Sequence, residues 1–198
     1  MTKPELVLAS SSPYRKSLLE RLGMPFDCAS PDIDETPRPN EKAGALALRL
    51  AVAKARALEH QYPGRIIIGS DQVAALPDGS LLNKPGSHEQ AQQQLSESSG
   101  KCVRFLTGLA VLDTRTGALE SCCETYTVHF RNLSQQEISN YLYKEQPYDC
   151  AGSFKMEGLG ITLFSSLEGR DPNSLIGLPL IALTDILARC GLNPLLQP

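Results

Sequence analysis

The sequence predicts an α/β fold in which a mixed, largely parallel twisted sheet is flanked by helices, with two lobes around a central cleft. Strand and helix patterns alternate along much of the chain, which favours a sheet covered by helices. Residues 66–70 are almost all apolar, as expected for a strand buried on both faces. Residues 101–113 and 118–130 alternate in polarity around a Thr-Arg-Thr-Gly turn and predict an antiparallel hairpin. No linker or repeat divides the chain, so we expect a single domain over residues 1–198.

The first 60 residues predict two strands and two helices. Residues 6–10 form an apolar opening strand, and Ser12 and Pro13 after it are typical of a helix N-cap and first helical position. This helix is expected to end at Gly23. A short strand and an acidic, proline-rich loop follow, and the Ala- and Leu-rich residues 43–60 predict the second helix.

The later segments continue the alternation. A Pro-Asp-Gly turn after residue 76 predicts a small hairpin, and the polar residues 87–98 predict a helix. Ser134 and Glu137 have the spacing of a capping box, so another helix begins there. Residues 158–164 are expected to form a strand, and a closing helix ends at Gly191.

Composition narrows the function classes. A net charge of −3 argues against a nucleic-acid-binding surface, which usually requires a basic face. The apolar runs are far shorter than the roughly 20 residues of a membrane span, and the N-terminal run is shorter than the roughly 7–15 residues of a secretory signal. We therefore expect a cytoplasmic protein without nucleic-acid or membrane partners.

The cysteines and histidines do not predict a metal site. The six cysteines contain no C-x-x-C, and Cys122 and Cys123 are adjacent, which favours reduced packing residues over a zinc site or a disulfide framework. The three histidines lie far apart. Any metal would therefore have carboxylate ligands, which indicates Mg²⁺ or Mn²⁺.

An acid and a polar turn are the first candidates for chemistry. Asp71 follows the buried strand at residues 66–70, and ligands of such sheets bind at the carboxyl ends of strands. Asp71 either caps a loop or takes part in a reaction. The turn from Ser10 to Ser12 and the free N–H groups after it suit an anion. Arg15 opposes the helix dipole, so it is either directed at a phosphate or simply solvated.

Further charged residues complete a set suited to polyphosphate chemistry. Glu35 lies in the acidic loop, Lys54 in the second helix and Lys84 in a loop after the buried strand. Each of them alone would be interpreted as a solvated side chain. Together with Asp71 and Arg15 they supply carboxylates for a metal and positive charge for phosphate oxygens. No Walker A motif and no G-x-G-x-x-G motif occurs in the sequence.

The motifs LASSSPYR, DET, AVAKA, GSDQ, NKPGS, CAGSFKMEGLG and IGLPL, in this order, resemble the Maf family of nucleotide pyrophosphatases. The resemblance extends from residue 6 to about residue 192. It implies hydrolysis of a nucleoside triphosphate to the monophosphate and pyrophosphate with a divalent metal, and it suggests a homodimer. It also implies that Asp71 is the catalytic carboxylate, which either orients and deprotonates the water or holds the metal, and that Glu35 and Asp71 are the candidate metal ligands. The implied substrate-binding residues are Ser10, Ser12, Arg15, Lys54 and Lys84.

Three positions depart from many Maf proteins and resemble the subfamily that hydrolyses N7-methyl-GTP. Tyr14, Gln72 and Glu157 stand where an arginine, a threonine and a glutamine are common, although the subfamily often has tryptophan at the aromatic position. N7-methylation gives guanine a positive ring, which an aromatic face attracts by about 0.5–2 kcal/mol. A glutamate can accept hydrogen bonds from guanine N1–H and the exocyclic amine, and losing an arginine removes a repelling charge.

Two alternatives remain open. One is a Maf-type pyrophosphatase for dTTP or UTP, which Gln72 and Glu157 disfavour. The other is a nucleotide-binding regulator of septum formation without significant turnover, which the full set of acids and lysines disfavours. Lys155 has no derivable role and faces either the phosphates or the rim of the cleft.

Overall fold

The computed structural model describes residues 5–196 and confirms a mixed α/β fold. Seven strands form one sheet in the order β2-β1-β3-β5-β6-β7, with β4 paired to β3. The strands are β1 (Leu6–Ala9), β2 (Phe26–Ala29), β3 (Ile66–Ala75), β4 (Leu81–Leu82), β5 (Cys102–Asp113), β6 (Ala118–Phe130) and β7 (Phe164–Glu168). The α-helices are α1 (Pro13–Glu20), α2 (Ala43–Ala57), α3 (His88–Ser98), α4 (Gln135–Glu145), α5 (Pro172–Ile176) and α6 (Leu180–Arg189).

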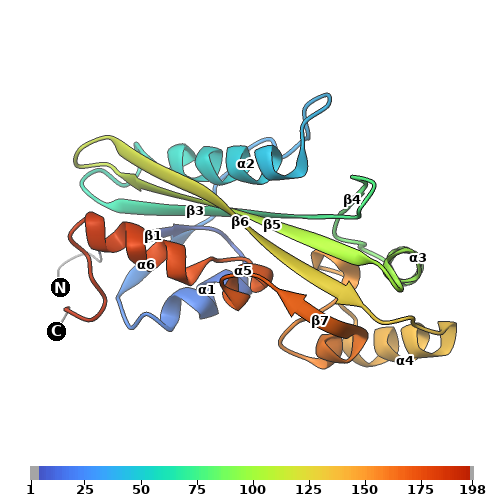
Figure 1. Ribbon diagram of the computed structural model, residues 1–198. Coiled ribbons are helices and arrows are strands. Elements are labelled where there is room, and N and C mark those ends of the chain that lie inside the picture. Colours follow the sequence, from blue (N-terminus) through green and yellow to red (C-terminus); the bar gives the residue numbers. More distant parts are fainter. Residues whose placement is uncertain (1–4, 197–198) are drawn as a thin grey trace.

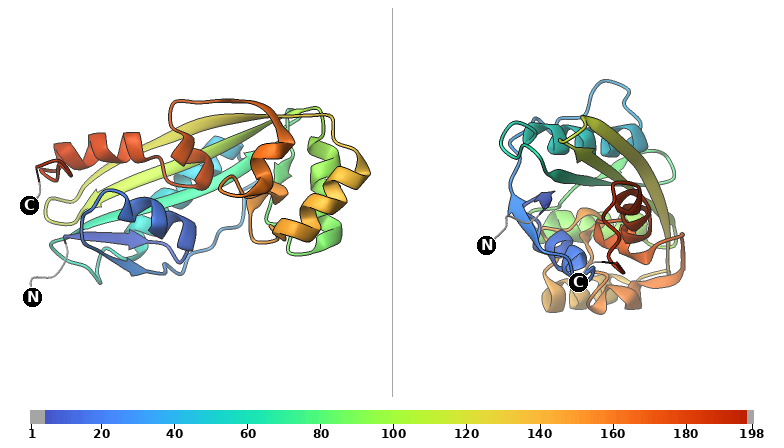
Figure 2. Two further views of the ribbon diagram at one scale, coloured as in Figure 1. Left: turned by 90° about the horizontal axis from the view of Figure 1, so that it is seen from below. Right: turned by 90° about the vertical axis from the view of Figure 1, so that its left-hand side faces the viewer.

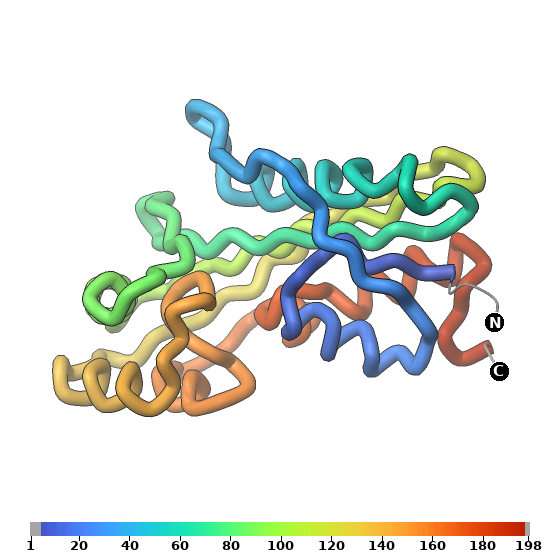
Figure 3. The backbone as a smooth tube through the Cα atoms, turned by 180° about the vertical axis from the view of Figure 1, so that it is seen from behind, coloured from blue at the N-terminus to red at the C-terminus, as the bar shows by residue number. Residues whose placement is uncertain are grey.

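Helices cover both faces of the sheet. In Figure 1, α2 lies on one face, and α1, α5 and α6 lie on the other. Figure 2 shows an elongated molecule in which α3 and α4 lie side by side at the far end of the long strands. The segment between β2 and α2 rises away from the sheet beside the start of α2 (Figure 3). In the part of the chain described, no helix is long and apolar enough to cross a membrane.

The buried side chains divide the core into two lobes. In one lobe, Leu19 and Leu183 belong to a cluster under α1 and α6, and Ala51 and Ile67 belong to a cluster under α2. In the other lobe, a third cluster centred on Phe105 joins the strand ends to α3 and α4. The long strands pass through both lobes, so one sheet carries both halves of the core.

Parallel pairing is confined to one edge of the sheet. β1 pairs in parallel with β2 and β3, whereas β3–β4, β3–β5, β5–β6 and β6–β7 are antiparallel. Parallel pairing is therefore a smaller part of the sheet than we expected. The short turn between β5 and β6 permits only the antiparallel arrangement that the sequence predicted there.

The predicted end of the central strand was wrong. β3 does not stop at residue 70 but continues to Ala75, so Asp71 lies inside the strand. The parallel partner β1 ends at Ala9, opposite Gly69, and antiparallel pairing with β5 extends β3 beyond that point. Asp71 therefore lies two residues past the end of the parallel pairing, where the chain of β1 turns away.

The strand predicted at residues 158–164 was also largely wrong. Leu159–Leu163 form a 3₁₀-helix, and β7 begins only at Phe164. The backbone N–H of Gly160 donates to the carbonyl of Lys155 at 3.1 Å, a local bond that replaces pairing with a neighbouring strand.

The other helices follow the sequence predictions within a few residues. Ser12 caps α1 with Pro13 in its first turn, and Ser134 and Glu137 form the expected capping box of α4. The six cysteines are free, in agreement with the prediction that no disulfide framework forms.

Helix α2 lies very close to the sheet because glycines face it. A Cβ atom at Gly69 would collide with the carbonyl oxygen of Ala51, and one at Gly108 would collide with the carbonyl oxygen of Ala47. Only glycine permits so close an approach of two backbones. The approach places Lys54, near the end of α2, directly over the middle of β3.

We expect Gly69→Ala to lower the free energy of unfolding by about 1–3 kcal/mol, because the new Cβ atom forces α2 away from β3. Gly44→Ala, a change in α2 itself, is the control. Its Cβ atom would meet side-chain atoms, the nearest being Leu106 Cδ2 at 3.3 Å, and alanine favours helix. Urea unfolding measures both variants, and equal stabilities would contradict the close-packing explanation.

Candidate active site

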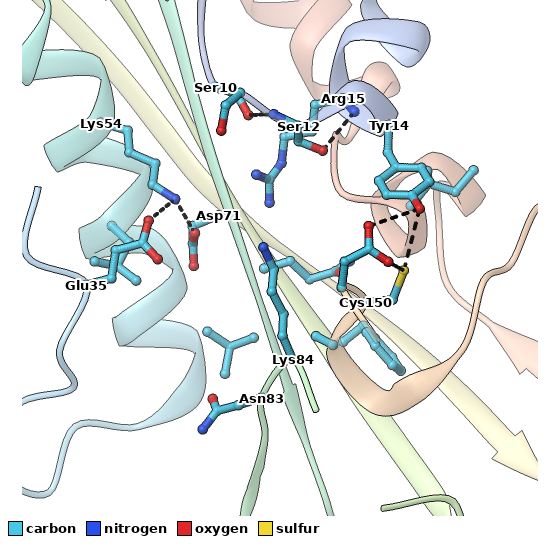
Figure 4. A pocket seen from close by; sticks show the side chains of 18 of the residues that line it. Ser10, Ser12, Tyr14, Arg15, Glu35, Lys54, Asp71, Asn83, Lys84 and Cys150 are labelled. Carbon is cyan, nitrogen blue, oxygen red and sulfur yellow. Dashed lines mark hydrogen bonds and ion pairs between the residues drawn. The ribbon is translucent and has the colours of Figure 1, made fainter. Parts of the chain in front are cut away.

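A cavity of about 620 Å³ lies between the two lobes, a volume typical of small-molecule sites. Its lining comes mainly from the turn before α1 and the start of α1, the loop before α2 and α2 itself, the middle of β3, the loop after β4, the segment after α4, and α5. It brings together all ten residues singled out from the sequence: Ser10, Ser12, Tyr14, Arg15, Glu35, Lys54, Asp71, Gln72, Lys84 and Glu157. Figure 4 shows eighteen of the lining side chains.

The turn between β1 and α1 is organised by its serines. Ser10 Oγ accepts a hydrogen bond from the N–H of Ser12 at 3.1 Å. Ser12 Oγ accepts one from the N–H of Arg15 at 3.4 Å, which caps the helix. The whole turn from Ser10 to Arg15 lines the cavity, so the positive end of α1 faces the space where an anion would bind.

Arg15 is held in the site rather than freely solvated. Its Nε donates to the carbonyl of Gly177 at 2.8 Å, and its guanidinium group points into the cavity (Figure 4). Burial lowers the pKa of Arg15, while the nearby charges of Asp71 and Glu35 raise it. Because arginine remains protonated in proteins, the residue provides a permanent positive charge.

Lys54 joins the two candidate metal ligands. Its Nζ atom donates to Asp71 Oδ1 at 2.6 Å and lies 2.6 Å from Glu35 Oε1. Lys54 and Asp71 are each 8% exposed, whereas the Glu35 side chain is largely exposed on its loop. The lysine therefore balances both acids and directs them toward one point in the cavity (Figure 4).

Arg49 holds the loop that carries Glu35. Its Nη2 donates to the carbonyl of Thr36 at 3.0 Å, and its Nε donates to Glu41 at 2.7 Å. The hydrogen bonds from Arg49 lower the pKa of Glu41 to about 2. The pair therefore stabilises the loop fully above the ordinary pKa of glutamate, and this stabilisation is lost as the pH falls toward 2.

Glu35 and Asp71 have the chemistry to hold a divalent cation. Mg²⁺ is commonly bound by one or two carboxylates together with water and substrate phosphates. Both acids converge on Lys54 and line the cavity. Within residues 5–196, no group of three or more His, Cys, Asp or Glu side chains forms a closed metal site. A pair of carboxylates suits a divalent cation whose other ligands are water and substrate phosphates.

Lys84 brings positive charge from the other lobe. It is exposed on the loop after β4, beside Asn83, and its side chain points into the cavity (Figure 4). Arg15 and Lys84 thus approach the central space from different elements.

Tyr14, on the wall away from Lys54, contacts two neighbours that the sequence did not suggest. Its hydroxyl donates to Asp149 Oδ2 at 3.3 Å and lies 3.8 Å from Cys150 Sγ. Burial is the main cause that raises the pKa of Tyr14, so the hydroxyl stays protonated. Glu157 is exposed and lines the same cavity.

Gln72 connects β3 to helix α5. Its side-chain nitrogen donates to the carbonyls of Ser174 at 2.8 Å and Leu175 at 3.0 Å. Thr107 on β5 supports the same contact, because its hydroxyl donates to the carbonyl of Ser174 at 2.8 Å. Gln72 lines the cavity and also holds the helix that closes it, and its role in specificity remains a prediction.

Asp171 is a positioning residue that we did not predict. Its carboxylate accepts hydrogen bonds from the N–H groups of Asn173 and Ile181, both at 2.8 Å, and so holds the starts of α5 and α6. The connection between these helices contains Gly177, the partner of Arg15. The Asp-Pro pair that opens α5 is a recognisable N-terminal helix signal.

Lys155 lies outside the cavity lining. Its Nζ donates to the carbonyl of Glu145 at 3.1 Å and so binds the last turn of α4, where a cation is favourable. Of the two roles left open, a contact with phosphates is not supported by this position.

Comparison with known proteins agrees with the fold. Residues 5–190 match the family model described as Maf-like protein. A solved HAM1 protein from Coxiella burnetii is similar, with a TM-score of 0.52 and 14% identity over 94% of this chain and 99% of that chain. The Ham1 protein of Staphylococcus aureus has a TM-score of 0.46 and 14% identity over 78% of this chain and 88% of that chain. At this identity the first likeness concerns the fold alone.

Proposed function

The chain belongs to the Maf family, and from this premise we propose that it is a nucleoside triphosphate pyrophosphatase that hydrolyses N7-methyl-GTP to N7-methyl-GMP and pyrophosphate. The observation that carries the proposal is that all ten predicted site residues, which come from separate segments of the chain, line one cavity. They form a cationic region for phosphates, a pair of acids joined by Lys54, and an aromatic wall at Tyr14.

In the proposed reaction, water attacks the α-phosphorus and the bond to the bridging oxygen of the leaving pyrophosphate breaks. Lys54 engages Asp71 Oδ1, which leaves Oδ2 to orient the water and accept its proton. A divalent cation held by Glu35 and Asp71 would supply further positive charge to the phosphate oxygens. Arg15 and Lys84 stabilise the charge that develops on the departing pyrophosphate.

The proposed selectivity for the nucleobase depends on the cavity wall opposite Lys54. Tyr14 presents an aromatic side chain to the cavity, and Glu157 offers a carboxylate for the donor edge of guanine. Gln72 supports this region through its bonds to α5.

Pyrophosphate release from N7-methyl-GTP, GTP, dTTP, UTP and CTP, each with Mg²⁺, Mn²⁺ or EDTA, tests this proposal. We expect metal-dependent turnover with a strong preference for the methylated substrate. Preference for pyrimidine nucleotides would retain the enzyme class and overturn the substrate. Nucleotide binding without pyrophosphate release, under every metal condition, would overturn the enzymatic proposal in favour of a regulator.

A further inference from the structure

The four carboxylates that line the cavity fall into two groups with different surroundings. Glu35 and Asp71 share the ammonium group of Lys54. Asp149 and Glu157 lie on the other side, and no lysine, arginine or histidine of residues 5–196 forms an ion pair with either. This second wall therefore presents two exposed carboxylates that form no ion pair within the described part of the chain.

Asp149 is the acid of this wall with defined contacts, and both contacts are neutral. Its Oδ2 accepts from the hydroxyl of Tyr14 at 3.3 Å, and its Oδ1 lies 3.4 Å from Cys150 Sγ. Burial first, and then the charge of Asp149, raise the pKa of the Cys150 thiol to about 12. The thiol therefore remains uncharged at physiological pH, and both neighbours that position the Asp149 side chain are neutral.

We propose that Asp149 is a specificity-determining residue whose carboxylate faces the base of the bound nucleotide and selects a positively charged ring. The inference rests on the proposed function and adds a residue to it. A carboxylate beside an aromatic ring attracts a cationic purine such as N7-methylguanine more strongly than neutral guanine. The same charge repels phosphates, so it also directs the triphosphate toward Arg15, Lys54 and Lys84.

Asp149→Asn tests this inference, because asparagine keeps the size of the side chain and an acceptor for the hydroxyl of Tyr14. The measurement is kcat/KM for N7-methyl-GTP and for GTP with Mg²⁺. We expect the ratio of the two values to fall about tenfold, the scale on which a charge-assisted contact exceeds a neutral one. The loss should appear mainly as a higher KM for the methylated substrate.

Two further variants separate charge from positioning. Tyr14→Phe removes the hydroxyl that Asp149 binds but keeps the aromatic ring and the carboxylate, so it should lower the ratio less than Asp149→Asn does. Asp185→Asn removes an equal charge from an exposed position on α6, where it pairs with Arg170 at 3.1 Å, and should leave the ratio unchanged. A fall in Tyr14→Phe as large as in Asp149→Asn would overturn direct selection by charge.

Binding of N7-methyl-GMP and GMP, measured by calorimetry without metal, provides a readout that does not depend on turnover. Loss of the preference for N7-methyl-GMP in Asp149→Asn would support the inference. A wild-type protein that prefers the methylated nucleotide, with an unchanged preference in Asp149→Asn, would overturn the inference and leave the proposed function intact. If the wild-type protein does not hydrolyse N7-methyl-GTP more efficiently than GTP, the proposed substrate is wrong, and this inference is wrong with it.

Discussion

Replacing Asp71 with asparagine should reduce pyrophosphate release by about 10²–10⁴-fold, the range expected for loss of a general base. The side chain is buried in the middle of β3 and its carboxylate opens onto the cavity. Asparagine has nearly the same shape and can still accept a hydrogen bond from Lys54, but it cannot take a proton from water. Lys54 also keeps its contact with Glu35, so the fold should survive.

Asp113→Asn is the matched control for this prediction. Asp113 is equally buried, lies on the neighbouring strand β5 and pairs with Arg115 at 2.7 Å, outside the cavity. We expect it to lower the melting temperature and to leave turnover close to that of the wild type. The two measurements are the rate at saturating substrate and the thermal unfolding curve. Turnover of Asp71→Asn within a few fold of the wild type would show that another group performs this step.

The parts of the fold that short-range patterns determine were predictable from the sequence. The capping box at Ser134 and Glu137 and the turn between β5 and β6 act over a few residues, and the structure has both. The length of β3 depends instead on pairing with β5, which follows about 30 residues later in the chain. No local pattern contains that information, so the strand was predicted too short and Asp71 was placed at its end.

For the site, the sequence predicted which residues are present but not the contacts between them. The motif order of a known family predicted which residues would meet, but it did not predict that Lys54 would bind both Asp71 and Glu35. That contact requires α2 to lie against the sheet, which Gly69 permits. Asp149 had no signal in the sequence beyond an acid in a loop, because its significance depends on Tyr14, 135 positions earlier.

Lys54→Met should be the second most damaging substitution, with turnover lower by about 10²–10³-fold, as for other lost electrostatic contacts in active sites. Methionine keeps much of the apolar stem that packs in α2 but removes the charge between Asp71 and Glu35. Without this counter-ion the two carboxylates repel each other and lose their common partner in the cavity. The measurements are the rate at saturating substrate and the thermal unfolding curve, which separates the loss of charge from a structural defect. Lys144→Met, an exposed change on α4, should leave the rate unchanged.

The double variant Lys54→Met/Asp71→Asn decides whether Lys54 works through Asp71 or on the substrate alone. If the ammonium group acts chiefly by keeping Asp71 ionised and oriented, its removal should cost much less once Asp71 is already asparagine, because residues in one network are not additive. If the two losses multiply in full, Lys54 acts directly on the phosphates, and its ion pair with Asp71 is not the basis of its effect. We expect the non-additive result, because the two groups are 2.6 Å apart in a buried site and their charges interact strongly there.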